Sequence, residues 1–213
     1  MMDLKSTDKV LVHACCAPCS GAILEWLVGQ GVRPTVFFSN SNIYPLAEYE
    51  LRRGELLRYA AQLGQKATSS GQEPMGVVVI DDVYDHEAWR CAVRGLECEP
   101  ERGQRCLQCF RFRLERAARY AHEHGFNVLT TTLASSRWKD LEQVDAAGSY
   151  ACSLFPGLRW WGRNWRKGGL QERRSAIIRE QNFYNQTWCG CEFSHHDKTN
   201  EPTCPLPVEA PSR

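Results

Sequence analysis

The sequence has no apolar run that approaches the ~20 residues needed to span a membrane. Its first residues also lack the basic and then apolar stretches of a secretory signal peptide. Neither Gly-x-Gly-x-x-Gly nor Gly-x-x-x-x-Gly-Lys-Ser/Thr occurs, and the Ser-Gly-Gly loop of ATP pyrophosphatases is missing. We therefore expect a cytoplasmic protein with no membrane partner, and ATP-driven thiolation chemistry is disfavoured.

The chain also lacks an excess of charge and any obvious linker. It has 26 Lys and Arg against 25 Asp and Glu, for a net charge of +1. A nucleic-acid partner would therefore need a local basic patch. The 213 residues are enough for one domain with its own core. We expect a single catalytic domain over residues 1–194 and a flexible polar tail over residues 195–213.

Short apolar runs alternate with helical patterns along the chain. The runs predict strands at 9–14, 35–38, 77–80 and 128–132, and the patterns predict helices at 18–27, 48–63, 110–124 and 141–147. Such alternation predicts an α/β fold with a mostly parallel, Rossmann-like sheet and helices on both faces. Folds of this kind place their sites at the carboxyl ends of the strands, where we expect a metal site.

Cysteine is abundant, with 11 residues in the chain. In a reducing compartment, cysteines are more often metal ligands or redox thiols than a disulfide framework. Cys15 and Cys16 lie between a predicted strand and helix, and Cys106 and Cys109 form a Cys-x-x-Cys at another helix start. A helix N-terminus favours thiolate over thiol. The four thiolates can hold an iron–sulfur cluster or a zinc ion, and their spacing also leaves open that no metal binds.

A further pair, Cys189 and Cys191, flanks a glycine in Trp-Cys-Gly-Cys. Glycine makes the backbone permissive enough for the two sulfurs to approach each other. A disulfide in so small a ring would be strained and therefore easily reduced. The pattern fits a redox pair, but it fits additional metal ligands or inert thiols equally well.

Residues 159–179 form a basic, tryptophan-rich segment. It contains seven basic residues against one acidic residue, with three tryptophans interleaved. Cations can neutralise phosphates while aromatic rings stack on bases. The candidates for RNA contact are Arg163, Trp165, Arg166, Lys167 and Arg174. The alternative is a solvated loop and helix whose tryptophans pack in the core.

Several motifs occur together in one order along the chain. They lie at residues 11–18, 40–43, 48–52, 103–109, 113–114, 130–133, 165–169, 174–175 and 189–194. In this combination the chain resembles the cobalamin-independent epoxyqueuosine reductases, the QueH-type family. The resemblance covers roughly residues 9–194, nearly the whole chain.

The resemblance implies an iron–sulfur oxidoreductase that reduces the epoxide of epoxyqueuosine in tRNA, the last step to queuosine. It implies a redox-active pair at Cys189 and Cys191 and an electron donor such as ferredoxin or flavodoxin. It also implies a [4Fe–4S] cluster on the four helix-start cysteines, Cys15, Cys16, Cys106 and Cys109.

Epoxide reduction to an alkene takes two electrons and two protons, whereas one cluster passes one electron at a time. The Cys189 and Cys191 pair could supply the second store of electrons. A second metal ion (Fe or Zn) could act as a Lewis acid, with Cys19, Asp81 or Asp82 as its ligands. The main alternative is a zinc-stabilised RNA-binding module without catalysis. A thiol–disulfide oxidoreductase leaves the other cysteines and the basic segment unexplained.

Overall fold

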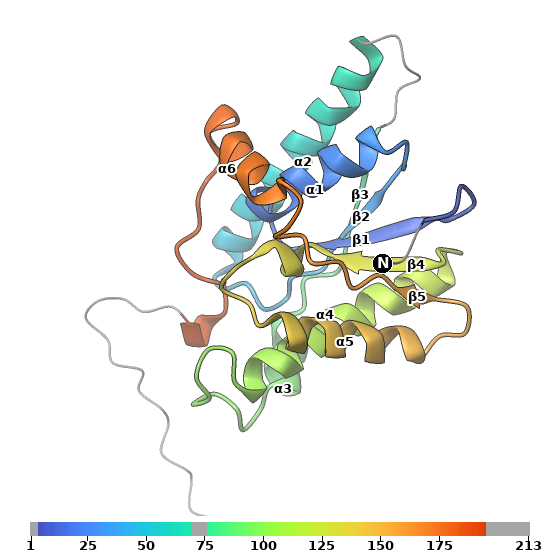
Figure 1. Ribbon diagram of the computed structural model, residues 1–213. Coiled ribbons are helices and arrows are strands. Elements are labelled where there is room, and N and C mark those ends of the chain that lie inside the picture. Colours follow the sequence, from blue (N-terminus) through green and yellow to red (C-terminus); the bar gives the residue numbers. More distant parts are fainter. Residues whose placement is uncertain (1–3, 70–75, 195–213) are drawn as a thin grey trace, which may run out of the picture.

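The computed structural model describes residues 4–69 and 76–194, so the tail predicted over 195–213 lies outside the described residues. A five-stranded parallel sheet in the order β3-β2-β1-β4-β5 forms its centre (Figure 1). The strands are β1 (Val10–Ala14), β2 (Thr35–Phe38), β3 (Val78–Asp81), β4 (Val128–Thr131) and β5 (Arg159–Trp160). The α-helices are α1 (Ala17–Gly29), α2 (Leu46–Ser69), α3 (His86–Ala92), α4 (Gln104–Glu123), α5 (Leu141–Ser153) and α6 (Leu170–Glu180). The predicted α/β fold is confirmed.

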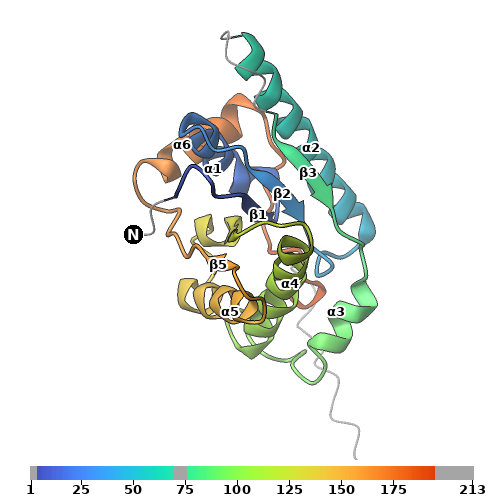
Figure 2. The ribbon, with the colours of Figure 1, turned by 90° about the vertical axis from the view of Figure 1, so that its right-hand side faces the viewer.

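Two helical layers cover the sheet, as predicted. Helices α1, α2 and α6 lie on one face, and α4 and α5 lie on the other, which Figure 2 shows from the side. Every residue of β1 and β4 is buried, as expected for central strands of a parallel sheet covered on both faces. Across the part of the chain that the structure describes, no helix combines the length and the apolar character required to cross a membrane.

The order of the strands places a topological switch point between β1 and β4. Strand β1 pairs with β2 on one side and with β4 on the other. The backbone N–H of Cys15, just after β1, donates to Oγ1 of Thr132, just after β4, at 3.3 Å. Open α/β sheets bind their ligands at such a crevice beyond the strand ends. The first pair of cysteines therefore lies where this fold places a site.

Several elements differ from the sequence prediction. Helix α4 begins at Gln104, several residues before the predicted start at 110, so Cys106 and Cys109 both lie in its first turns. Helices α2 and α5 extend beyond their predicted bounds, and α3, α6 and β5 were not predicted. Helix α3 and strand β5 have only seven and two residues, which is too short for a helical or alternating period to emerge.

Gly148 on α5 lets the helix approach the indole of Trp160. A Cβ atom at this position would lie 2.3 Å from the Trp160 ring, so Gly148→Ala forces the helix or the ring to move. We expect the free energy of unfolding to fall by about 1–3 kcal/mol, the usual cost of overpacking. Gly54, exposed within α2 and with open space around it, is the matched control. Gly54→Ala should raise the stability by about 0.5–1 kcal/mol in the same urea titration. Equal stability of the two variants would contradict this packing.

Candidate redox and metal site

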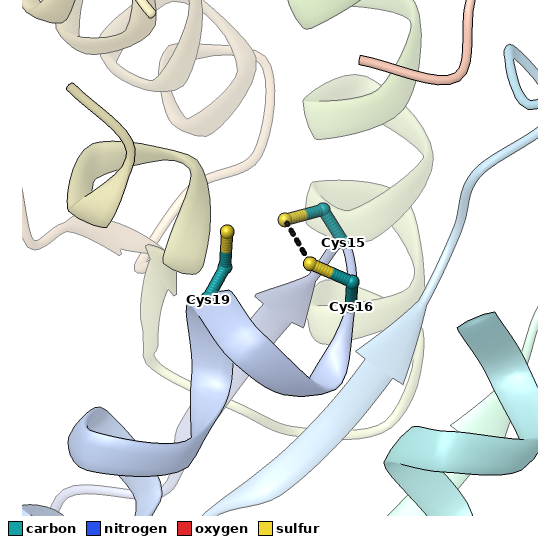
Figure 3. Close-up of side chains that lie close together, drawn as sticks. All are labelled: Cys15, Cys16 and Cys19. Atoms are coloured by element: carbon teal, nitrogen blue, oxygen red, sulfur yellow. Dashed lines mark hydrogen bonds between the residues drawn. The ribbon is translucent and has the colours of Figure 1, made fainter. Parts of the chain in front are cut away.

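Three cysteines converge at the carboxyl end of β1. The sulfurs of Cys15, Cys16 and Cys19 all lie within 4.8 Å of one another (Figure 3). Cys16 is the N-cap of α1, and Cys19 lies one turn further on, which brings its side chain back to the helix start. The Cys15 and Cys16 sulfurs are 3.8 Å apart. Bonds of ~2.3 Å to one tetrahedral zinc ion place two sulfurs about this far apart.

Protons are shared unequally within this group. Hydrogen bonds from the Cys16 and Cys19 thiols, together with the positive charge of Arg113, hold the pKa of Cys15 well below its usual value. The hydrogen bond with Cys15 raises the pKa of Cys16, and for Cys19 it raises the pKa to about 11. The group thus holds one thiolate easily and resists further deprotonation. A bound metal cation would remove this resistance, with release of protons.

A second set of cysteines lines a separate pocket. Cys106 and Cys109 from α4 share it with Cys189 and Cys191 from the C-terminal segment. The backbone N–H of Arg102 donates to the Cys106 sulfur at 3.2 Å. The two pairs lie about eighty residues apart in the sequence, and the fold brings them into the lining of one pocket.

The Cys-Gly-Cys segment is held in place by its backbone. The amide N–H of Tyr44 donates to the Gly190 carbonyl at 2.9 Å, and the Arg52 guanidinium donates to the Cys189 carbonyl at 3.1 Å. Gly190 has a φ of +98°, where a side chain is strained, and an added Cβ would lie 2.9 Å from Ile43. Glycine is therefore required between the two cysteines.

The two sulfurs of this segment differ in acidity. A hydrogen bond from Cys191 holds the pKa of the Cys189 thiol well below its usual value, and the same bond raises the pKa of Cys191. Lys139 lines the same pocket. Burial lowers the pKa of Lys139, but the nearby Cys189, Cys109 and Cys106 sulfurs outweigh this effect and leave it raised. The pair therefore offers a thiolate at Cys189, a proton at Cys191 and an ammonium group beside them.

Arg113 connects the two sets of cysteines. Its guanidinium is buried, donates to the Ser39 carbonyl at 3.3 Å and lines the pocket of Cys106 and Cys109. Its positive charge also acts on Cys15. Arg113 can therefore balance negative charge on both sets.

The predicted ligands are divided between the two sets. Among the described residues, Cys15 and Cys16 group with Cys19, whereas Cys106 and Cys109 group with the Cys189 pair. All these donors are thiols at least half shielded from solvent, and those of α1 and α4 lie at helix starts. This donor chemistry fits a thiolate-bound metal centre, either a zinc ion or an iron–sulfur cluster.

Comparison with known proteins decides the family. The family model for the epoxyqueuosine reductase QueH matches residues 10–197. The chain is 43% identical to the epoxyqueuosine reductase QueH of Histophilus somni over 190 residues, which are 89% of this chain and 73% of the relative. The corresponding protein of Acinetobacter baylyi is 42% identical over 90% of this chain and 83% of its own length. The epoxyqueuosine reductase QueH of Thermotoga maritima is 31% identical over 87% of this chain and 89% of its own length.

The chain belongs to the epoxyqueuosine reductase QueH family. The resemblance predicted from the ordered motifs is confirmed. The activity of the chain is that of an epoxyqueuosine reductase, a reaction of queuosine biosynthesis. The two cysteine sets, one of them at the switch point of the sheet, are the chemically distinctive feature that this QueH chain offers for a reduction.

Two tryptophans of the basic segment of this QueH protein, Trp161 and Trp165, are buried rather than open to a nucleic acid. Trp165 is only 1% exposed, and its ring packs edge-on against Trp26 at 5.7 Å. The Arg163 guanidinium lies over the Trp26 ring at 3.9 Å. The Trp165 ring is therefore part of the core, as in the alternative interpretation of the segment, and has no open face for a base.

The remaining cations of the segment have different surroundings. Arg166 donates to the carbonyl of Lys139 at 2.7 Å, which fixes the backbone beside the cysteine pocket. Arg174 donates to the Pro18 carbonyl at 3.0 Å, and its charge lowers the pKa of Cys19 against the larger opposing effects. Lys167 is exposed. Of these three, Lys167 is the one most open to an RNA phosphate.

The two aspartates considered for a second metal have other partners. Asp81 accepts from Tyr49 at 2.9 Å and from Arg53, and Asp82 accepts two hydrogen bonds from Arg116, at 2.6 and 2.8 Å. Within the described part of the chain, neither carboxylate belongs to the group around Cys19. Cys19 itself does belong to it, so it is the better placed of the three suggested ligands.

Sequence reasoning did not assign the roles of Arg52, Arg113 and Lys139. Arg52 and Arg113 belong to motifs that carry the resemblance, but no local spacing relates them to cysteines far along the chain. No sequence pattern marked Lys139, because its importance comes from the partial burial of a lysine near the Cys189 sulfur. Only the fold brings these residues to the site.

Proposed function

We propose that this chain is an iron–sulfur oxidoreductase that reduces the epoxide of epoxyqueuosine in tRNA to give queuosine. The observation that carries the proposal is the pocket shared by Cys106, Cys109, Cys189, Cys191 and Lys139, because Arg113 in its lining also acts on Cys15 of the other group. Thiols that can hold a metal centre thus lie beside a thiol pair that can change its oxidation state. A ferredoxin or a flavodoxin is the class of electron donor that suits such a centre.

The cysteines at the two helix starts would hold the metal centre. A [4Fe–4S] cluster, when bound, would supply electrons one at a time to the site. The proposed ligands are Cys15, Cys16, Cys106 and Cys109. Cys19, which lies against Cys15 and Cys16, would be free to bind a second Fe or Zn ion.

The protein's own thiols can supply both electrons for one epoxide. The Cys189 thiolate and the Cys191 thiol become a disulfide and release two electrons and one proton. An epoxide that gains these two electrons, this proton and a second proton from Lys139 becomes an alkene and water, so the two half-reactions balance. Two electrons from the external donor and two protons from solvent then restore the thiol pair and Lys139.

The acidities in the pocket suit this exchange. Cys189 has a pKa well below its usual value and is the sulfur that gives up its proton first. Cys191 has a raised pKa and keeps its proton available. The raised pKa of Lys139 keeps an ammonium group beside Cys189, where it can donate a hydrogen bond to an epoxide oxygen.

One experiment tests the proposed function directly. The protein is reconstituted with iron and sulfide without oxygen and is then incubated with tRNA that carries epoxyqueuosine and with a reductant. We expect brown protein with the visible absorption of an iron–sulfur cluster, and mass spectrometry of the digested tRNA should detect queuosine. A colourless zinc protein that binds the tRNA without changing it would refute the proposal.

The proposal also predicts a role for Lys167 in RNA binding. Each phosphate contact to single-stranded RNA contributes about 0.7 to the salt slope of the binding constant. We expect Lys167→Ala to weaken tRNA binding and to reduce the slope by about this amount. Lys9, exposed just before β1 and so at the opposite end of the sheet from the cysteines, is the matched control. If both variants keep the slope of the unmodified protein in a filter-binding titration, Lys167 makes no phosphate contact.

A further inference from the structure

Trp138 is a large aromatic side chain left in solvent next to the cysteine pocket. It is 64% exposed, yet it lines an adjoining pocket together with Cys106, Cys189 and Lys139, which also line the pocket of Cys109 and Cys191. It therefore lies where that pocket meets solvent. Exposed tryptophan adds little to folding stability, so its position at this opening points to a contact with another molecule.

The backbone around Trp138 is fixed by arginines from other parts of the chain. Arg102 donates from Nε to the Trp138 carbonyl at 3.1 Å. Arg166 donates to the carbonyls of Ser136 and Lys139, at 2.5 and 2.7 Å. Trp138 therefore lies on a segment whose backbone is fixed by hydrogen bonds. This lowers the entropic cost of using its ring for binding.

The ring and the positive charges at the opening favour a polyanion that carries planar groups, such as bases. The Arg137 guanidinium lies over the Trp138 ring at 4.9 Å, and Arg102 and Lys139 line the opening. The acidic residues Glu101 and Asp140 line it as well, but Asp140 caps α5 by accepting from the N–H of Glu142 at 2.9 Å. Single-stranded nucleic acid is bound by this combination of a stacking ring and adjacent cations.

We propose that Trp138 is a stacking platform for an unpaired nucleobase next to epoxyqueuosine in the tRNA, with Arg137 beside it for the phosphate. The proposal rests on the proposed function, because it needs the modified tRNA as the substrate. Unpaired bases of RNA loops can be splayed out and stacked on aromatic side chains. A base stacked on Trp138 would leave its neighbour at the entrance to the pocket of Cys189.

The test compares three variants in the reconstituted, full-length protein. Trp138→Ala should weaken binding of the tRNA by roughly 5- to 150-fold, the range for loss of one stacked base, with an unchanged salt slope. Trp138→Phe keeps a ring and should retain most of the affinity. It should also reduce the quenching of tryptophan fluorescence by tRNA. Tyr150→Ala is the control, because Tyr150 is 46% exposed and also has an arginine over its ring, at 5.3 Å, but lies outside the pocket lining.

The outcomes separate this proposal from the proposed function. If the unmodified protein forms queuosine and Trp138→Ala binds tRNA as tightly as Tyr150→Ala, the stacking platform is refuted while the function stands. If Trp138→Ala binds tRNA normally but accepts electrons more slowly from a protein donor than from a chemical reductant, the ring is a docking point for that donor, which also refutes stacking. Failure of the unmodified protein to form queuosine refutes the proposed function itself.

Discussion

The Cys106→Ser protein is expected to lose its iron–sulfur absorption and its activity, whereas the Cys19→Ser protein keeps the absorption. Serine is a far weaker ligand for iron than a thiolate, so a cluster with one of its four thiolates removed should not assemble. Cys19 is outside the proposed cluster ligands, and its loss should remove at most a second ion. The measurements are iron and sulfide per protein after reconstitution without oxygen, the visible absorption, and the rate of queuosine formation.

This pair of variants is decisive because the structure allows another arrangement. The sulfurs that it brings within 4.8 Å of one another are those of Cys15, Cys16 and Cys19. If Cys19→Ser loses the metal while Cys106→Ser keeps it, the centre is a single ion on these three thiolates. Cys152, buried on α5 and outside both sets, is the control, and Cys152→Ser should keep its iron.

The predicted sheet was right because its central strands are strongly marked. Residues 10–14 and 128–131 are continuous buried runs bounded by turns, which few other structures produce. The helical pattern of α2 was less exact. The apolar residues of the helix predicted at 48–63 include Leu51, Leu56 and Leu57. Leu51 and Leu57 are 45% and 36% exposed, while Leu56 is fully buried. Periodicity locates a helix, but neighbouring elements decide how much of its apolar face is covered.

The tryptophans show most clearly what local sequence cannot decide. Basic residues around Trp165 predicted an RNA surface, yet its ring is in the core beside Trp26. Trp138 attracted no prediction, because its neighbours carry no unusual pattern, and it is the exposed ring at the cysteine pocket. The same residue type serves core or surface, and only the tertiary packing distinguishes the two.

Some residues of the candidate site could be predicted from the sequence, and others are brought to it by the fold. The cysteines could be found from spacing, since adjacent residues and a Cys-x-x-Cys at helix starts are local features. Cys19 joins Cys15 and Cys16 because one helical turn separates them, which is also local. Arg113 and Lys139 meet the cysteines only through the fold, so no pattern in their own surroundings could predict them.

The Cys189→Ser protein is expected to keep its iron–sulfur absorption and to lose repeated turnover. Removing a group that takes part directly in the chemistry usually costs at least about a hundredfold in rate. The Arg52 guanidinium and the Tyr44 N–H hold the backbone of this segment rather than the sulfurs, so the substitution should leave the segment in place. Product formed per enzyme under excess tRNA, together with the iron content, measures the effect. Cys91→Ser is the control, because Cys91 is an exposed thiol on α3.

A variant of Cys191, the other sulfur of the pair, extends the Cys189→Ser experiment. If Cys189 and Cys191 act as one two-electron unit, Cys191→Ser should be as slow as Cys189→Ser, and the double variant should be no slower than either, because residues that act together are not additive. Additive losses would mean separate roles, such as proton transfer by Cys191 alone. Full repeated turnover by Cys189→Ser with an intact cluster would show that this pair is not the store of the two electrons.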